Sequence, residues 1–201
     1  MTTAKDLFII AIGPTPQHAV GQGDLSLALA GAELVDLIDA GVVSVDEDHI
    51  VAAGSSAPDD RLLAEAAAQL VRQPPHERVE DWLWRRGRDL SAAYQADLEG
   101  SGDLTSKRSG RLPFSPLRVE PADTPVHRRA ADRWQQQEPV LTALASVLGI
   151  SHEGSDDEPG LDDDAVTAVV AAAHDAVMEL EAARQRRTIE NATFANIWRG
   201  P

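Results

Sequence analysis

Apolar residues recur at helical spacing along most of the chain. Between Leu25 and Ala40 they fall on one face of a helix, with Asp24 as its expected N-cap and Gly41 as its expected C-cap. The same spacing predicts later helices over residues 59–72, 77–98, 125–148 and 161–187. Gly87 is expected to interrupt or bend the helix over 77–98, because glycine is a poor helix former. Most of the chain is therefore predicted to be helical.

Two stretches are typical of β-hairpins. Their strands would cover residues 42–45, 49–52, 103–106 and 111–119. Pro113 and Pro116 confine the last of these strands to a sheet edge or an extended loop. The apolar run Leu7–Ile12 is too short to assign by periodicity. The predicted fold class is mainly α: a single-domain helical bundle with two short β-hairpins.

One acidic, low-complexity stretch divides the chain near its C-terminal end. We expect a helical core over residues 4–150, an acidic linker over 151–164, and a C-terminal helix and tail over 165–201 that pack on the core. The acids of residues 162–164 would lie favourably at the positive N-terminus of that last helix.

The composition narrows the class of protein. The chain has no cysteine, which excludes a disulfide framework and a thiolate metal site. Ala, Leu and Val dominate the apolar residues, which favours close-packed helices over a sheet sandwich. Leu7–Ile12 is too short for a signal peptide or a membrane span. We expect a cytoplasmic protein that does not cross a membrane but could lie peripherally on its inner face.

The net charge of −15 argues against general nucleic-acid binding. The helix over 25–40 and the hairpin after it resemble the recognition helix and wing of a winged-helix protein. That helix, however, carries Glu33, Asp36 and Asp39 and no Lys or Arg, so it would repel phosphates. We therefore expect no nucleic-acid partner.

Basic residues concentrate between Arg85 and Arg133, where ten Lys/Arg face seven Asp/Glu. The candidates for an anion site lie around Gly87 and on the turn of the second predicted hairpin: Arg85, Arg86, Arg88, Lys107, Arg108 and Arg111. The planar fork of arginine matches phosphate oxygens. Near an anionic leaflet each residue contributes about 1 kcal/mol, so together they would make a weak, salt-sensitive anchor. The alternative is that they only decorate solvated helix faces.

Two tryptophans flank this region. Trp82 shares a helix face with Val79 and Leu83 and is expected in the core. Trp84 points elsewhere, closer to Arg88. It is either an interfacial aromatic beside the basic cluster or a second buried anchor.

No pattern in the sequence indicates catalysis. The six histidines are scattered, without a pair at metal-ligand spacing. Gly21-Gln22-Gly23 lacks the preceding strand and third glycine of a dinucleotide-binding loop, and the acidic runs lack calcium-loop spacing. We expect no catalytic residues, no metal and no cofactor.

Three blocks of sequence, in this order, resemble the Golgi phosphoprotein 3 family. They are a first long helix with its glycine stop (27–41), a helix, proline break and tryptophan-bearing helix (60–83), and the stretch 98–104 that leads into the second hairpin. Their order and spacing over residues 7–148 carry the resemblance. The alanine-rich, arginine-rich composition is typical of a bacterial protein from a GC-rich genome.

The resemblance implies a non-catalytic helical bundle edged by small hairpins. Eukaryotic members bind phosphatidylinositol 4-phosphate on Golgi membranes and retain glycosyltransferases there. Their phosphate site uses a Trp and an Arg at the positions of Gly21 and Ala30, and two basic residues at the positions of Arg88 and Ser91. This chain retains Arg88 from that set. An anionic phospholipid head group, phosphatidylinositol 4-phosphate by resemblance, is the expected ligand.

Relatives present apolar side chains at the tip of the second hairpin for membrane insertion or self-association. Here Leu112 and Phe114 keep two apolar positions, while Arg111 replaces a third. A homo-oligomer through this hairpin is one expectation, and a hairpin packed on its own domain is the other. Because three of the four head-group contacts differ, the competing hypothesis for function is a cytosolic module that binds a protein partner and has lost lipid binding.

Overall fold

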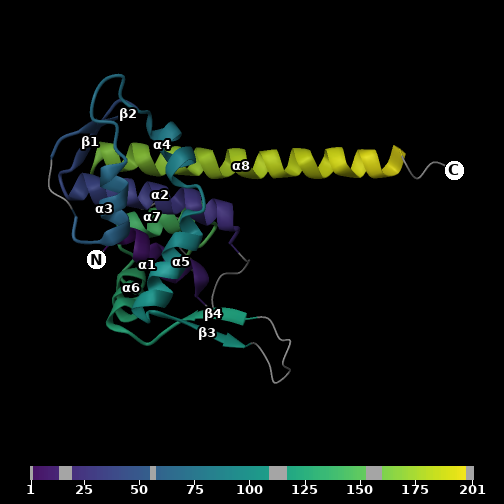
Figure 1. Ribbon diagram of the computed structural model, residues 1–201, viewed down its shortest axis with the longest axis horizontal. Helices are drawn as coiled ribbons and strands as arrows, with labels where there is room; N and C mark the ends of the chain where they lie inside the picture. Colours follow the sequence, from purple (N-terminus) through teal and green to yellow (C-terminus); the bar gives the residue numbers. More distant parts are fainter. Residues whose placement is uncertain (1, 14–19, 55–57, 109–116, 153–159, 198–201) are drawn as a thin grey trace.

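The computed structural model describes residues 2–13, 20–54, 58–108, 117–152 and 160–197 (Figure 1). In these ranges the helices are α1 (Thr3–Ile12), α2 (Gln22–Asp39), α3 (Arg61–Ala68), α4 (Val79–Arg86), α5 (Leu90–Ser101), α6 (Pro125–Gln135), α7 (Pro139–Val147) and α8 (Asp164–Ile197). Two antiparallel hairpins complete them: β1 (Val43–Asp46) with β2 (His49–Ala52), and β3 (Leu104–Arg108) with β4 (Leu117–Pro121). The predicted mainly α class is confirmed.

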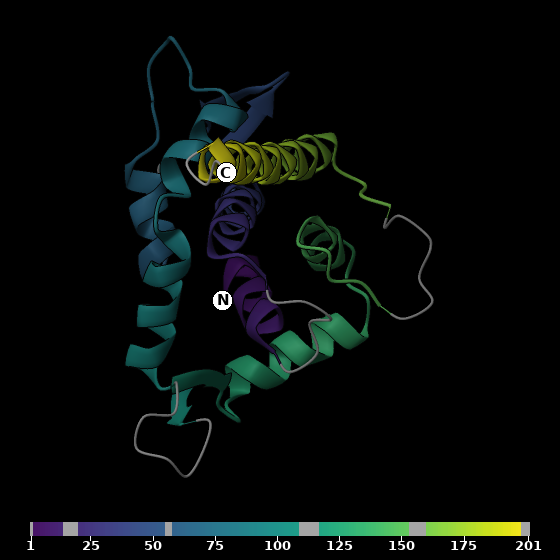
Figure 2. The same ribbon diagram turned by 90° about the vertical axis from the view of Figure 1, so that its right-hand side faces the viewer.

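Helix α2 is the centre of the bundle. Figure 2 shows α2 between α1 and α8, with α5 on one side and α7 on the other, and α6 along the edge of the bundle next to α1. Twelve of its 18 residues are buried, so α2 is covered on all sides. It begins one turn before the predicted start. Its N-cap is Gly21, so the prediction of Asp24 as the cap is wrong.

Helix α2 stops at the predicted glycine, although its C-cap is Ala40 and Gly41 is the residue after the cap. Gly41 takes φ +67°, its N–H donates to the carbonyl of Ile38 (2.8 Å), and the N–H of Val42 donates to Leu37 (2.9 Å). This pair of hydrogen bonds is a Schellman motif, which favours glycine at the left-handed position. The chain then turns directly into β1.

The first apolar run, left open by periodicity, is helix. Thr2 caps α1, and the carboxylate of Asp36 on α2 accepts from the backbone N–H groups of Thr3 (2.8 Å) and Ala4 (3.1 Å). Residues 7–9 are buried against the core. A side chain from α2 thus satisfies N–H groups that the first turn of any helix leaves unpaired.

Helix α8 packs along α2 through small residues. A Cβ built on Gly31 would lie 3.2 Å from the Cβ of Ala173, so the two helices approach closely there. Asp163 caps α8 by accepting from the N–H groups of Ala165 and Val166. The helix runs 34 residues, past its predicted end at residue 187, and its C-terminal half extends away from the bundle (Figure 1).

Two of the predicted helices are divided. The stretch 125–148 forms α6 and α7, because Gln137 takes φ +53° and Pro139 begins a new helix capped by Glu138. The stretch 77–98 is interrupted at Gly87, as predicted. A Cβ there would lie 2.6 Å from the Leu83 carbonyl oxygen and 3.3 Å from Leu27 of α2. This close approach fixes the junction between α4 and α5 against α2.

The second hairpin differs from the prediction. Its register pairs Leu104 with Pro121 and Arg108 with Leu117. Lys107 and Arg108 therefore belong to β3 and not to a turn over residues 107–110. Arg111, Leu112 and Phe114 lie outside the described residues.

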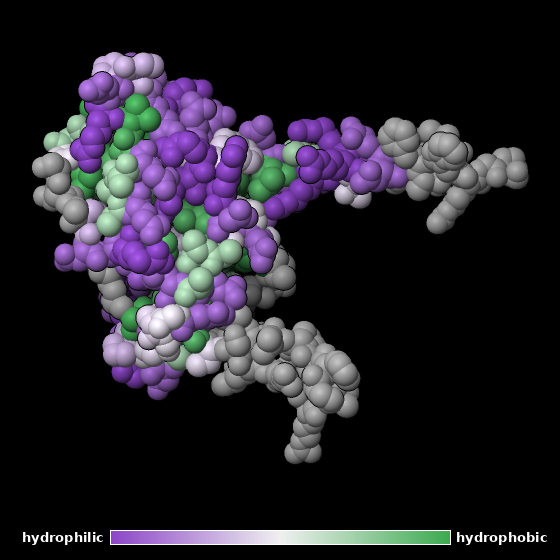
Figure 3. All heavy atoms as spheres, viewed as in Figure 1, coloured by the Kyte–Doolittle hydropathy of each residue, from purple (hydrophilic) through white to green (hydrophobic). Residues whose placement is uncertain are grey.

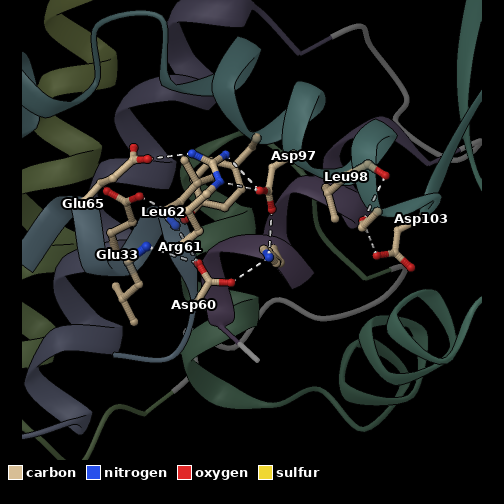
Figure 4. Close-up of polar contacts among 12 residues, drawn as sticks. Glu33, Asp60, Arg61, Leu62, Glu65, Asp97, Leu98 and Asp103 are labelled. Atoms are coloured by element: carbon tan, nitrogen blue, oxygen red, sulfur yellow. Dashed lines mark hydrogen bonds and ion pairs between the residues drawn. The ribbon is translucent and has the colours of Figure 1, made fainter. Parts of the chain in front are cut away.

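An ion-pair network joins α1, α3 and α5 on one side of the bundle (Figure 4). The ammonium of Lys5 contacts Asp60 (2.6 Å) and Asp97 (2.9 Å), and Arg61 contacts Asp97 (2.9 Å) and Glu65 (2.6 Å). Lys5, Asp60 and Asp97 are mostly shielded from solvent, which reduces screening of their interactions.

Candidate anion-binding site

The three arginines around Gly87 point in different directions. Arg86 is buried, and its Nε and Nη2 donate to the two carboxylate oxygens of Glu33 at 2.7 and 2.9 Å. Its Nη2 also donates to the carbonyl of Leu62 (3.1 Å), and the hydroxyl of Tyr94 donates to Glu33 (3.0 Å). Arg86 therefore satisfies a carboxylate inside the core and presents no charge at the surface.

Arg85 is also engaged by its own domain. Its Nε and Nη2 lie 2.7 Å from the two carboxylate oxygens of Glu77, and its guanidinium lies 5.1 Å from the ring centroid of Trp82. The ion pair with Glu77 raises the pKa of Arg85 above its ordinary value. Arg85, in the last turn of α4, therefore pairs with a residue just before the start of the same helix and is not free for a ligand.

Other basic side chains of the segment 85–133 are paired as well. Arg129 and Arg133 contact the buried carboxylate of Asp6, and Arg128 contacts Asp123. Desolvation raises the pKa of Asp6, and the two arginines oppose this shift. The local excess of basic residues in the sequence is thus not a continuous free surface.

Arg88 is the exception among the arginines around Gly87. It is exposed and makes no ion pair or hydrogen bond with another described residue. It lies on the rim of a cleft of about 340 Å³ between the start of α2, the junction of α4 and α5, and α8. The cleft is lined by Gln22, Gly23, Ser26, Leu27, Trp84, Gly87, Arg88, Asp89, Ser91, Ala92 and Leu180.

The tryptophans separate as their spacing indicates. Trp82 is fully buried and donates its indole N–H to the carbonyl of Ala30 (3.3 Å), which confirms its place in the core. Trp84 is half-buried and lines the cleft with Arg88. An indole with one face exposed beside an arginine suits the boundary between protein and head group.

The N-terminus of α2 also opens on the cleft. Gly21 provides no side-chain cap, so the first N–H groups of the helix lack partners within it. The positive end of the helix dipole adds to the charge of Arg88 at this point. Two carboxylates oppose this positive charge. Asp24 lies in the first turn of α2, and Asp89 directly precedes α5. These two carboxylates offset part of the positive charge that Arg88 and the helix dipole bring to this region.

Gly21, Ala30, Arg88 and Ser91 stand at the positions of the phosphate-binding residues in the relatives described above. The structure brings only some of these four positions together. Arg88 and Ser91 both line the cleft, and the Ser91 N–H donates to the hydroxyl of Ser26 (3.0 Å). Gly21 directly precedes the α2 wall of the cleft. Ala30, by contrast, is fully buried two turns further along the helix.

The basic residues of the second hairpin lie elsewhere. Helix α5 begins beside Arg88 and ends at Ser101, shortly before β3 (Figure 1). Twelve helical residues span about 18 Å, so Lys107 and Arg108 start at the far end of α5 from the cleft. The structure does not gather them with Arg88 into one cluster.

One residue near the cleft has no signal in the sequence. Arg184 of α8 contacts both carboxylate oxygens of Asp24 at 2.6 and 2.7 Å, across 160 positions of the chain. Its nearest hint is the basic run of residues 184–187, which lies in a different predicted segment. Gly23 makes room for it, because a Cβ there would lie 2.7 Å from Arg184 Nη2.

The described ranges contain neither a metal-binding cluster nor a membrane-spanning helix. No group of three or more His, Asp or Glu side chains there is arranged to hold a metal ion. Among the helices of the same ranges, none combines the length and apolarity that crossing a bilayer requires.

Comparison with known proteins gives one family. The model of the family described as Golgi phosphoprotein 3 (GPP34) matches residues 4–197, which is nearly the whole chain. No curated protein matches the sequence.

Proposed function

Because the chain belongs to the Golgi phosphoprotein 3 (GPP34) family, we propose that it is a non-catalytic peripheral membrane protein that binds an anionic phospholipid head group. The ligand we propose is phosphatidylinositol 4-phosphate, which the resemblance implies. The site is the cleft between α2, α4–α5 and α8. The membrane face would be the cytoplasmic one.

The observation that carries the proposal is the state of Arg88. It is exposed at a cleft, without an acidic partner among the described residues, whereas Arg85 and Arg86 beside it are committed to Glu77 and Glu33. A surface arginine held free at a concave site is suited to a phosphate, which it can bind through two parallel N–H donors. Trp84 would cover one side of the head group.

We propose weak and salt-sensitive binding. A charge-assisted hydrogen bond contributes about 1.5–3 kcal/mol, and each further basic residue near an anionic leaflet about 1 kcal/mol. Asp24 and Asp89 reduce this sum. The hairpin residues Lys107, Arg108 and Arg111 would supply a second, separate contact, and Leu112 and Phe114 would insert into the bilayer or join two copies of the chain.

The test is co-sedimentation with phosphatidylcholine vesicles that contain phosphatidylinositol 4-phosphate. A second set of vesicles contains phosphatidylserine in the amount that gives the same surface charge. A third set contains phosphatidylcholine alone and is neutral. The proposal predicts pelleting with the phosphoinositide vesicles that falls as salt rises. Folded protein that stays in the supernatant at low salt with all three vesicles would refute it.

A protein partner is the second candidate, and a particular surface favours it. Helix α8 exposes Met178 (53%) near its middle and Ile189 (67%) in its extended C-terminal half. Both line a hollow of about 890 Å³ that α7 and the start of α2 also line. On the face drawn in Figure 3, the described part of the α8 extension is mainly hydrophilic. A variant with Met178 and Ile189 changed to glutamate should no longer bind a partner at this surface, whereas Arg88→Ala should still bind it. The opposite pattern would remove this candidate.

A further inference from the structure

The C-terminal half of α8 extends away from the body of the protein (Figure 1). Its residues from Glu181 to Asn191 are exposed, apart from the half-buried Ala182 and Ala183. A helix in a protein is stabilised mainly by the packing of one of its faces, because helix propensity alone is marginal over a short length. This half of α8 would therefore gain stability from a further helix packed on it.

Four residues form a stripe along this part of the helix. Their spacing of four, three and four residues keeps them on one face, as in the core positions of a coiled coil: Met178, Ala182, Gln185 and Ile189. Met178 is 53% exposed and Ile189 is 67% exposed, and both line the hollow between α8 and the body. The small side chain of Ala182 allows a second helix to approach closely. The stripe thus has a large apolar side chain at each end and a small one between them.

The stripe is complementary to a second copy of itself in antiparallel orientation. When Met178 of one copy lies opposite Ile189 of the other, Ala182 lies opposite Gln185, because both pairs are centred on the same point of the helix. A twofold axis at that point repeats each contact, as in a symmetric dimer. Each large apolar side chain then meets another, and each Gln185 packs over a small alanine.

Charged side chains beside the stripe match in this orientation. Glu179 and Arg186 lie on the same side of the stripe, because they directly follow Met178 and Gln185. Residues that flank the core positions form the ion pairs between helices that set their orientation. In the antiparallel pair, Glu179 of each copy would face Arg186 of the other. Both side chains are exposed, and neither forms an ion pair with another described residue.

The surroundings of Glu179 strengthen this match. It borders a pocket of about 200 Å³ between the turn of the first hairpin, the start of α4 and α8. The charged residues that line this pocket are mostly acidic: Glu47, Asp48, Arg78, Glu80, Asp175 and Glu179. Arg78 is already engaged by Asp48 at 2.7 Å. An arginine from a second copy would therefore meet surplus negative charge, which favours this partner over an acidic one.

We infer that two copies of the chain associate through α8 as an antiparallel pair. Met178 of each copy faces Ile189 of the other, and Glu179 of each faces Arg186 of the other. A parallel pair would oppose Gln185 to Gln185 and would bring both bodies to the same end of the helices (Figure 1). In the antiparallel pair the bodies lie at opposite ends, and the last turns of each α8 lie over the hollow of the other copy.

This inference names the occupant of the α8 surface that was given above for a protein partner. It does not depend on head-group binding, which the vesicle experiments test separately. The paired segments are short, so the interface belongs to the small class that is typical of transient contacts. The expected behaviour is a monomer–dimer equilibrium that shifts toward the dimer as the concentration rises.

Sedimentation equilibrium of the full chain over a series of concentrations measures this association. The variants are Met178→Glu combined with Ile189→Glu, Glu179→Arg, Arg186→Glu, and the last two combined. Arg187→Glu is the matched control, because Arg187 is an exposed arginine on the opposite face of the helix from the stripe. Circular dichroism checks that each variant is folded.

The two glutamates in the stripe should abolish the dimer, because they would place charges in its apolar contacts. Each single charge reversal should raise the dissociation constant about tenfold, since it acts twice in a symmetric dimer. Glu179→Arg combined with Arg186→Glu should restore the wild-type value, because it exchanges the two partners. The control should stay within about twofold of the wild type at physiological salt, which screens a change in net charge.

Disulfide formation tests the orientation, because the natural chain has no cysteine. A mixture of Met178→Cys and Ile189→Cys should form a mixed disulfide on oxidation. In a parallel pair, each variant would instead form a disulfide with itself, and that result would overturn the antiparallel arrangement.

Three further results would contradict the inference. Wild-type protein that stays monomeric up to about 1 mM would leave the α8 surface to a different protein. A dimer that survives the two glutamates at positions 178 and 189 would place the contact elsewhere, for example on the second hairpin. A combined charge reversal that associates no better than the single reversals would show that Glu179 and Arg186 do not face one another.

Discussion

The guanidinium of Arg86 lies against the carboxylate of Glu33 inside the core, joined by two hydrogen bonds of 2.7 and 2.9 Å. The pair connects α4 to α2, and Tyr94 adds a third partner from α5. Desolvation raises the pKa of Glu33, while Arg86 and Tyr94 oppose the shift. The same burial and the neighbouring carboxylate hold the pKa of Tyr94 well above its ordinary value. Three helices thus meet at one buried charge pair.

Removing one partner of the Glu33–Arg86 pair should strongly destabilise the folded protein. We expect Glu33→Ala or Arg86→Ala to lower the free energy of unfolding by about 3–5 kcal/mol, because the other charge is left buried and unpaired. Glu65→Ala, which removes an exposed partner of Arg61, should cost less than about 1 kcal/mol. Urea denaturation measures both.

The double replacement Glu33→Leu with Arg86→Met serves as a control. It removes both charges and keeps most of the volume, so it should be clearly more stable than either single variant. Equal losses in the double and single variants would contradict the claim that an orphaned charge is the cause.

The stability should also depend on pH through Asp36. Desolvation raises its pKa from 3.8 to about 6, although the N–H groups of Thr3 and Ala4 donate to it. Between these two values the folded state holds a proton that the unfolded state has lost. This contribution to stability is therefore present at low pH and disappears as the pH rises toward 6, a change of about 3 kcal/mol at most.

Asparagine at position 36 cannot titrate, so comparison with the wild type isolates this effect. The difference in unfolding free energy between Asp36→Asn and wild type should move in favour of the variant as pH rises from about 4 to about 6. Urea denaturation at a series of pH values gives the curve. A constant difference across that window would show that Asp36 has an ordinary pKa in the folded state.

The close contact of α2 with α8 predicts a sharp dependence on side-chain size. Ala173 meets Gly31 where a further carbon has no room, so Ala173→Leu should destabilise the protein by about 1–3 kcal/mol. Ala171→Leu, on the exposed face of the same helix, should have an effect within about 0.5 kcal/mol. Thermal unfolding of the two variants makes the comparison, and equal effects would mean that the helices are not tightly packed.

Local signals in the sequence account for the parts of the fold that were predicted. Gly41 ends α2 in a Schellman motif, and Gly87 divides α4 from α5, because each is decided within a few residues of chain. The break at Pro139 had an equally local signal, a proline inside a helical pattern, but periodicity alone extended the helix across it.

The site was less predictable because its side chains come from distant positions. Helical spacing could have separated Arg86, which shares a face with buried Val79 and Leu83, from exposed Arg88. Glu33, the partner of Arg86, lies 53 positions away from it in the sequence, and Asp24 lies 160 positions from Arg184. No periodicity relates residues at such separations, so only the packing of α2 with α4 and α8 brings them together.

Trp84 should report on the bound state. Because it is half-buried in the cleft while Trp82 lies in the core, brominated lipids should quench the fluorescence of Trp84 on phosphoinositide vesicles. Trp84→Phe should abolish this quenching. Trp134 belongs to α6, stacks on His152 and does not line the cleft, so Trp134→Phe should preserve the quenching. Quenching that survives Trp84→Phe would place the membrane contact at another part of the protein.

The most direct test of the account compares Arg88→Ala with Arg72→Ala on vesicles containing phosphatidylinositol 4-phosphate at low salt. Both are exposed arginines, but Arg72 lies away from the cleft and contacts only the carbonyl of Gly54 among the described residues. We predict that Arg88→Ala lowers the vesicle-bound fraction, with an affinity loss of about tenfold or more, and that Arg72→Ala binds like the wild type. Equal binding of the two variants would contradict the claim that Arg88 forms the head-group site.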